Sequence, residues 1–338
     1  MPHVRGEAAV LVAPGRLEVE EVAFRDLAED EVLVRNTLAA ICGSDVHRVR
    51  AESPFFRDMR DHPYPCPAGY PGHEGVGEVV ESRSARFTPG DLVLTVPNHA
   101  YMASFARYQT IGDRFLLPLK RGAAAPSTHL MAQQLGTVVF ALKRFWPEPV
   151  PEGRTAAVVG VGSAGLLFLQ TLRHRGFEKV VAVDQEPGRL AVARSLGADA
   201  TVLVPGQSAE EVVMEVTGGR GADLVVEAAG TDGARTHAMR MVGQQGRLGF
   251  FGMPEEYDMS IPYAHLFVRN AQLIHAVGGA QLEPGLVSFR TALDLIGDGL
   301  IKVDDHITHT LDIKNIADAV ELAHTRQDDV VKVAISFD

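Results

Sequence analysis

The chain has 338 residues, 46% of them hydrophobic, and a formal net charge of −11 at pH 7. This length is more than one hydrophobic core usually serves, so two domains are expected. The excess of acidic residues argues against a nucleic-acid partner and against docking on an anionic membrane, because both surfaces would repel the protein.

Cysteine usage and the first residues favour a cytoplasmic location. The chain holds only Cys42 and Cys66. A disulfide between them is one alternative, but two cysteines do not make the framework typical of secreted domains. Residues 1–7 lack the basic start and apolar run of a secretory signal. The apolar run at 156–169 is too short and too rich in glycine to span a bilayer.

The first part of the chain has the pattern of a β-rich domain. Short runs of β-branched and apolar residues predict strands at 32–38, 76–81 and 92–96. Pro89-Gly90-Asp91 is a turn signal between the second and third of these runs.

From about residue 155 the pattern changes to alternating strands and helices. Helical spacing is seen at 164–175 and 189–196, and strands are predicted at 156–160, 179–184, 224–228, 247–252 and 273–277. Such alternation argues for a parallel, doubly wound sheet. After residue 279 it stops, and the tail ends in a strand-like run at 330–337. The tail is therefore expected to return to the first domain.

A glycine-rich segment indicates a dinucleotide site. Gly160-Val161-Gly162-Ser163-Ala164-Gly165 lies between a predicted strand and a predicted helix, which is the context that a G-x-G-x-x-G fingerprint requires. The first glycine permits the tight turn, the second lets the backbone approach a pyrophosphate, and the third lets the helix pack on the strand. The helix N-terminus would offer free N–H groups to the phosphates.

A carboxylate at the end of the next strand favours NAD over NADP. Asp184 lies about 20 residues beyond the fingerprint, where a carboxylate binds the ribose 2′-hydroxyl. Together with Glu186 it would repel a 2′-phosphate. The alternative reading is a structural glycine turn followed by a solvated aspartate.

A second group of residues suits a catalytic metal. Cys42, His73 and Glu74 offer a thiolate, an imidazole and a carboxylate, which together could hold a zinc ion with its fourth position open. His73 and Glu74 are adjacent, so both can converge only if the backbone is irregular. Each residue taken singly has a plainer interpretation, because a lone cysteine is usually a small buried hydrophobe and a His-Glu pair is usually solvated.

The order of these motifs resembles the zinc-dependent medium-chain alcohol and polyol dehydrogenases. The resemblance covers nearly the whole chain and rests on Cys42-Gly-Ser44-Asp45-Val-His47, Gly72-His73-Glu74-Gly-Val-Gly77, Gly90-Asp91, the glycines of 160–165 and Asp184. It implies a GroES-like catalytic domain at 1–148 completed by 285–338, and a Rossmann NAD-binding domain at 149–284. The expected fold class is α/β.

The resemblance also implies a role for each site residue. Cys42 and His73 would be zinc ligands, and Glu74 would ligate directly or stand just behind the metal. Asp45 would orient the ligating histidine. Ser44 and His47 would pass a proton from the substrate oxygen to solvent by way of the cofactor ribose.

Two further positions follow from the resemblance. Thr137 matches a residue that contacts the nicotinamide end of the cofactor. Gln133 stands where the family often has Cys, Asp or Glu near the zinc, so water could complete the metal shell. One catalytic zinc per chain is expected, because the four-cysteine lobe that binds a structural zinc in many relatives is missing.

The expected activity is hydride transfer between an alcohol, either a polyol or a secondary alcohol, and NAD. One rival is a zinc-free reductase of the same fold acting on quinones or activated alkenes. Another is a non-catalytic NAD-binding protein. Relatives form dimers or tetramers, often through sheet edges, and 273–277 is the candidate edge strand. The loop at 48–71 could shape substrate access, and its arginines at 48, 50, 57 and 60 raise the alternative of an acidic substrate.

Overall fold

The computed structural model describes residues 4–51, 63–276, 278–327 and 329–337. Arg57 and Arg60 lie outside the described residues. The chain divides into two compact units: residues 1–136, 279–297 and 303–338 form the first, and residues 137–278 with 298–302 form the second. Helix α3 (Pro126–Phe145) runs across this division.

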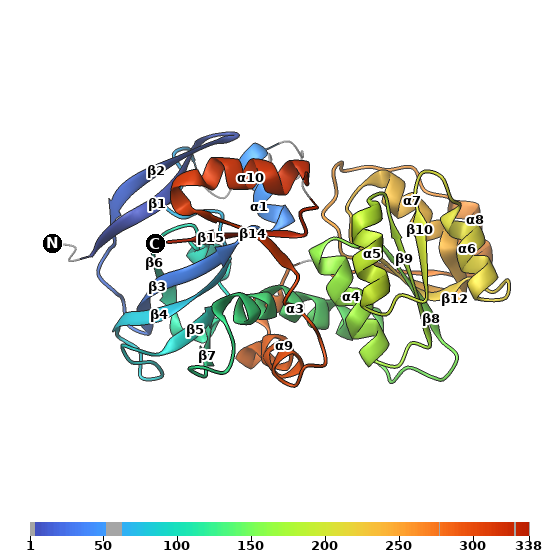
Figure 1. The fold of residues 1–338 in the computed structure, drawn as a ribbon, viewed down its shortest axis with the longest axis horizontal. Helices are drawn as coiled ribbons and strands as arrows, with labels where there is room; N and C mark the ends of the chain where they lie inside the picture. The colour runs from blue at the N-terminus through green and yellow to red at the C-terminus, as the bar shows by residue number, and fades with distance from the viewer. Residues whose placement is uncertain (1–3, 52–62, 277, 328, 338) are drawn as a thin grey trace. The chain divides into compact units, whose positions relative to one another are not determined.

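The first unit is built on two sheets whose strands are mostly antiparallel, which agrees with the predicted β-rich domain (Figure 1). A hairpin pairs β1 (Arg5–Ala13) with β2 (Arg16–Ala23). The larger sheet has the order β14-β15-β3-β4-β5-β7, with β6 also pairing with β3. Its strands are β3 (Glu31–Ala40), β4 (Glu74–Ser82), β5 (Leu92–Thr95), β6 (Tyr108–Gly112), β7 (Leu116–Leu119), β14 (Ile307–Asp312) and β15 (Lys332–Ser336).

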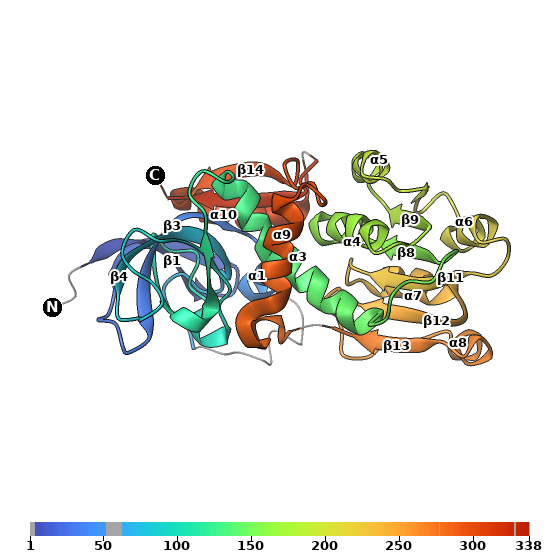
Figure 2. The ribbon, with the colours of Figure 1, turned by 90° about the horizontal axis from the view of Figure 1, so that it is seen from below.

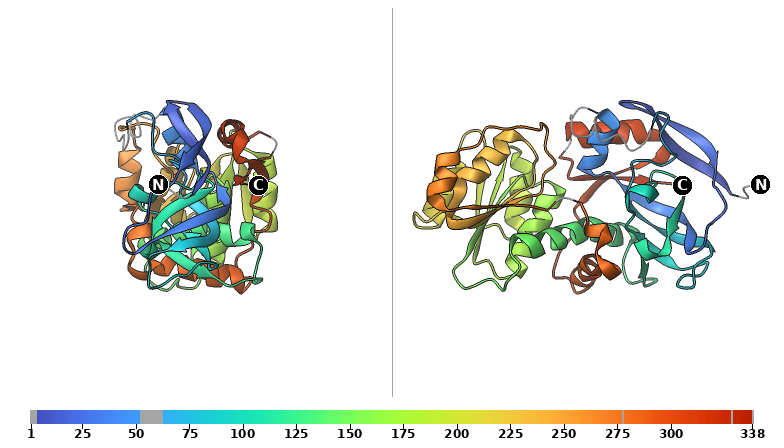
Figure 3. Two further views of the ribbon diagram at one scale, coloured as in Figure 1. Left: turned by 90° about the vertical axis from the view of Figure 1, so that its left-hand side faces the viewer. Right: turned by 180° about the vertical axis from the view of Figure 1, so that it is seen from behind.

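The tail of the chain supplies part of this first unit. Strand β15 pairs antiparallel with β3, and β14 pairs parallel with β15. Helix α10 (Ile316–Thr325) contacts β15, β2 and α1 (Gly43–Arg50), and Figure 3 shows it beside these elements. Isoleucine and valine side chains of the tail enter the same hydrophobic cluster as Leu11, Ile41 and Val46.

The predicted turn between β4 and β5 is confirmed. Gly90 has a φ of +98°, which costs glycine little and most other residues a good deal. Asp91 closes the turn, because its Oδ2 accepts a hydrogen bond of 2.8 Å from the backbone N–H of Thr88.

Helix α9 (Val287–Gly297) lies alongside α3, as Figure 2 shows. The ring of Phe289 occupies the space that a side chain at position 136 would need, since a Cβ built on Gly136 would fall 2.2 Å from Cδ1 of that ring. Close packing therefore requires glycine at position 136.

The second unit is the predicted doubly wound parallel sheet. Its six strands have the order β10-β9-β8-β11-β12-β13, and every neighbouring pair is parallel. They are β8 (Thr155–Val159), β9 (Lys179–Asp184), β10 (Ala200–Leu203), β11 (Ala222–Glu227), β12 (Val242–Phe250) and β13 (Gln272–His275). Residue 277, at the end of the predicted edge strand, lies outside the described residues.

Helices cover both faces of this sheet. Helices α4 (Ser163–His174) and α5 (Pro187–Ser195) pack on one face in Figure 1, and α6 (Ala209–Val216), α7 (Asp232–Met241) and α8 (Tyr263–Arg269) lie on the other. The strand order reverses between β8 and β11, which is the switch point where ligands bind in such sheets. Among the described residues, no helix is both long enough and apolar enough to cross a membrane.

Candidate functional site

The register of β3 and β4 brings the three candidate metal ligands together. Ala40 pairs with Glu74, so the end of β3 faces the start of β4. Cys42 follows β3 as the N-cap of α1, and His73 directly precedes β4. One ligating atom from each of Cys42, His73 and Glu74 lies within 4.8 Å of the others. Within the described ranges, this is the only group of three or more His, Cys, Asp or Glu side chains that lie close enough together to hold a metal ion.

Asp45 fixes the orientation of His73. Its carboxylate is fully buried, with Oδ1 2.7 Å from Nδ1 of His73 and Oδ2 accepting a hydrogen bond of 2.9 Å from the backbone N–H of Cys42. When Nδ1 carries the proton and donates it to Asp45, Nε2 keeps its lone pair for a metal. Burial would lower the pKa of His73, but the charge and hydrogen bond of Asp45 raise it well above its ordinary value.

Glu74 is paired with a residue that the sequence interpretation missed. The Nζ atom of Lys332 lies 2.8 Å from Oε2 of Glu74, and the two side chains are only 2% and 1% exposed. Burial would lower the pKa of Lys332, yet the charges of Glu74 and Cys42 raise it. One signal was available, because Lys332 is a lone charge among the apolar residues of 330–337.

Gln133 lies on α3 and is 5% exposed. Its Nε2 donates a hydrogen bond of 3.3 Å to the backbone oxygen of His73, so the amide is held against the candidate metal site. Gln133, which departs from the family pattern at this position, therefore lies beside the candidate metal ligands. A neutral amide brings no negative charge to a cation there.

The two candidate relay residues come from α1, the helix that begins beside Cys42. Ser44 and His47 are both half-buried and lie three positions apart, which puts them on one side of a helix. Arg48 donates a hydrogen bond of 3.4 Å to the backbone oxygen of Ser44, and Arg50 forms a 2.9 Å ion pair with Glu321 of α10. The arginine nearest the end of this helix therefore has a carboxylate partner within the first unit.

The glycine fingerprint joins β8 to α4. Gly160 has a φ of +84°, and Gly162 is the N-cap of the helix. A Cβ on Gly165 would fall 1.9 Å from the backbone oxygen of Gly160, so only glycine lets the helix approach the turn this closely. The N-cap side chain is absent, and α4 begins with backbone N–H groups that could bind a phosphate.

Asp184 ends β9 directly beside this turn and is 6% exposed. Its Oδ2 accepts a hydrogen bond of 2.7 Å from the backbone N–H of Val161, and its Oδ1 accepts one of 2.9 Å from that of Glu186. The carboxylate therefore ties the end of the strand to the fingerprint.

Two further side chains of the second unit are candidates for contact with a cofactor. Arg189 of α5 is 7% exposed, and its Nη1 lies 4.0 Å from the place that a Cβ on Gly162 would take. This buried cation near the fingerprint was also missed. Thr137 is half-buried and is the first residue of the second unit along α3.

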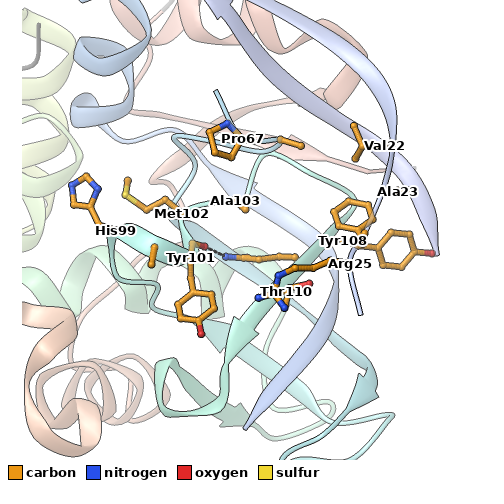
Figure 4. Close-up of a pocket in the computed structure, with 14 residues that line it drawn as sticks. Val22, Ala23, Arg25, Pro67, His99, Tyr101, Met102, Ala103, Tyr108 and Thr110 are labelled. Atoms are coloured by element: carbon orange, nitrogen blue, oxygen red, sulfur yellow. Dashed lines mark hydrogen bonds between the residues drawn. The ribbon is translucent and has the colours of Figure 1, made fainter. Parts of the chain in front are cut away.

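A separate hollow of about 310 Å³ lies in the first unit and is drawn in Figure 4. It is lined by residues of β2, β6 and the segment 99–103, and none of Cys42, His73 and Glu74 is among them. Arg25 on its wall is held by Glu31 through two hydrogen bonds of 2.7 and 2.6 Å. This pairing lowers the pKa of Glu31, and the hollow is distinct from the candidate metal site.

Both cysteines of the chain are free thiols. Neither Cys42 nor Cys66 forms a disulfide, so the disulfide alternative is wrong for the structure described here. Cys66 is buried in the hydrophobic cluster of the first unit, which also contains Tyr70 and Phe105.

Two family profiles match the chain. The alcohol dehydrogenase GroES-like domain matches residues 28–135, and the zinc-binding dehydrogenase domain matches residues 163–297. An alcohol dehydrogenase of Cupriavidus necator is 26% identical over 97% of this chain and 98% of its own. The 5-exo-hydroxycamphor dehydrogenase of Pseudomonas putida is 30% identical over 73% of this chain and 76% of its own.

Solved structures share the fold. A protein of Sinorhizobium meliloti 1021, solved bound to NADP, superposes with a TM-score of 0.84 at 22% identity, covering 99% of this chain and 100% of that one. The chain belongs to the zinc-type medium-chain dehydrogenase family. It is accordingly an oxidoreductase.

Proposed function

We propose that the chain is a zinc-dependent, NAD-linked dehydrogenase of alcohols, acting on polyols or secondary alcohols. The observation that carries this proposal is the buried Asp45 carboxylate, which holds both His73 Nδ1 and the Cys42 backbone. A carboxylate behind a ligating histidine is the usual support of a zinc site.

The donor set fits zinc. Cys42, His73 and Glu74 supply one soft and two borderline or hard donors within 4.8 Å of each other, and three protein ligands leave a fourth position for substrate. When bound, zinc would act as a Lewis acid on the substrate oxygen and lower the pKa of its hydroxyl. In the absence of substrate, Gln133 or water would complete the shell.

The protein side chains would then have separate tasks. Asp45 would orient His73, and Ser44 would accept the hydroxyl proton of the alcohol as it gives up its own. His47 would deliver a proton to solvent. Hydride transfer to the nicotinamide is the chemistry of the cofactor, and the protein supplies position and electrostatics.

The cofactor proposal rests on the second unit. Residues 160–165 would bind the pyrophosphate, Asp184 would bind the adenosine ribose, and Thr137 would contact the nicotinamide end. The neighbour from Sinorhizobium meliloti binds NADP, and Arg189 is a nearby cation. We nevertheless propose NAD, because the carboxylate of Asp184 is fixed beside the fingerprint and would repel a 2′-phosphate.

A homodimer or homotetramer is part of the proposal. Strand β13 is the edge of the parallel sheet, and its Leu273 is 41% exposed. Phe267 and Val268 of the adjacent α8 are 73% and 69% exposed. Because an edge strand of one copy can pair with the same strand of a second copy across a two-fold axis, we propose that β13 forms the contact.

The test is a panel of polyols, secondary alcohols, amino alcohols and acidic alcohols with NAD or NADP, run beside elemental analysis. NADH formation by protein that holds one zinc per chain is expected. Reduction of quinones or activated alkenes by metal-free protein, without alcohol oxidation, would instead support the zinc-free reductase. Cofactor binding with no turnover on any panel would support a non-catalytic NAD-binding protein.

A further inference from the structure

The ion pair between Lys332 and Glu74 lies directly against the candidate metal ligands. Both side chains are almost completely buried, at 2% and 1% exposure. Lys332 also donates a hydrogen bond of 3.4 Å to the backbone oxygen of Ile41, the residue before Cys42. An ammonium group removed from water needs a compensating anion, and Glu74 lies at ion-pair distance.

The sheet register explains why a residue so late in the chain reaches this place. Ala40 of β3 pairs with Glu74 on one side and with Ala334 of β15 on the other. Lys332 lies two residues before Ala334, and residues two apart on a strand share a face. The lysine is therefore built into the first unit by three neighbouring strands.

Glu74 is the carboxylate that lies at ion-pair distance from Lys332, with 2.8 Å between Nζ and Oε2. The attraction is mutual, so the ammonium of Lys332 also acts on the Glu74 carboxylate. Asp45 already serves His73 and the Cys42 backbone, and Gln133 brings no charge. Glu74 is thus the carboxylate that both a metal ion and Lys332 would draw on.

We propose that Lys332 is a positioning residue that competes with the metal for the Glu74 carboxylate and thereby limits the zinc affinity of the site. The inference rests on the proposed function, because it takes Cys42, His73 and Glu74 as the zinc site. It identifies Lys332 as the residue that controls how available Glu74 is as a ligand. It predicts that removal of the lysine raises the zinc affinity.

The main experiment measures zinc affinity in the absence of substrate and cofactor. Zinc is titrated against a chromophoric chelator with wild-type protein and with Lys332→Met. Loss of the lysine should lower the zinc dissociation constant about tenfold or more. It should also lower the melting temperature of the metal-free protein more than that of the zinc-loaded protein. A dissociation constant that is unchanged or higher would overturn the inference.

Two further variants keep the test decisive if Lys332→Met does not fold without metal. Lys332→Arg retains the charge, and its guanidinium can hold both carboxylate oxygens at once. It should therefore weaken zinc binding about threefold or more, and an affinity above that of the wild type would contradict the mechanism. In a Glu74→Gln background, replacing Lys332 with Met should change the affinity much less. A change of the same size there would overturn the inference, because Lys332 would then act on the metal by its charge alone and not through Glu74.

The matched control is Lys314→Met. Lys314 also lies in the first unit and lies 3.5 Å from the carboxylate of Glu7, but its side chain is 61% exposed. Its replacement should leave zinc affinity unchanged. If the wild-type protein binds no zinc, the proposed function fails together with the inference. If it binds zinc tightly and no change at Lys332 alters the affinity, only the inference fails.

Discussion

The Nδ1 atom of His73 lies 2.7 Å from Oδ1 of Asp45, a carboxylate with no exposed surface. The second oxygen of Asp45 is bound to the backbone of Cys42, so one side chain positions two candidate ligands. Asp45→Asn should therefore weaken zinc binding about 10- to 100-fold. Chelator competition measures the loss. Asp91→Asn, which alters a surface turn, is the control, and an unchanged affinity in the Asp45 variant would remove the residue from the site.

The cofactor preference should depend on Asp184. Its replacement by alanine removes the charge expected to repel a 2′-phosphate, so the ratio of kcat/KM for NAD to that for NADP should fall. Asp199→Ala is a matched control, because Asp199 also accepts a backbone hydrogen bond, of 2.7 Å from Val180, in the same sheet. Faster turnover of NADP than of NAD by the wild-type enzyme would show that Asp184 does not have this role.

His47→Gln should keep zinc and slow alcohol oxidation. General acid–base groups contribute roughly 10²- to 10⁴-fold to rate, and a relay open to solvent can be bypassed in part, so the lower end is expected. Metal analysis and steady-state rates, with added imidazole as a rescuing base, measure the two effects. His324→Gln on the exposed side of α10 should change neither. Loss of zinc in the His47 variant would reassign the residue as a ligand.

Stability should fall in mild acid because of His306. Burial, and then the positive charge of Lys332, lower the pKa of this 2%-exposed side chain from 6.5 to about 4. The unfolded chain therefore binds a proton first as the pH drops below 6.5, and unfolding becomes easier until about pH 4. The loss attributable to this residue is about 3 kcal/mol.

Denaturant unfolding at pH 7 and pH 4.5 tests this origin. In His306→Gln the difference in unfolding free energy between the two pH values should shrink, whereas His309→Gln, three residues away and only half-buried, should behave as the wild type. Equal pH dependence in all three proteins would assign the acid sensitivity to other groups.

The oligomer should depend on the β13 edge. Leu273→Lys places a charge on an exposed edge strand, which blocks strand pairing between copies. Light scattering after size exclusion should show a smaller species than for the wild type. Leu300→Lys is the control, because Leu300 is 50% exposed but lies outside β13 and α8. A monomeric wild type, or an unaltered mass in the Leu273 variant, would contradict the proposed contact.

The sequence predicted the second unit well because local pattern and neighbouring pairing agree there. The run at 179–184 coincides with β9, and the run at 224–228 nearly coincides with β11 (Ala222–Glu227). In a doubly wound sheet, each buried strand is a short apolar run followed by an amphipathic helix, and both signals can be read within about 30 residues.

The first unit was harder to predict from the sequence, because its paired strands lie far apart in the chain. Strand β15 reaches β3 across nearly 300 residues, so neither the partner of Glu74 nor the burial of Lys332 could be derived from spacing. Helix α3 was not predicted, although it spans 20 residues. The two metal motifs could be recognised in the sequence because their glycines and candidate ligands lie close together in the chain. The contacts of Gln133 and Arg189 could be seen only in the folded structure.

The place of β15 in the first sheet has a consequence for the order of events during synthesis. The second unit is almost one continuous stretch and can form its sheet as soon as residue 278 has left the ribosome. Strands β3 and β4 are made much earlier, yet their sheet gains its last strand, and Glu74 its counter-ion, only after residue 336 is made. The half of the protein that is translated first is therefore the half that matures last, because its sheet waits for β15.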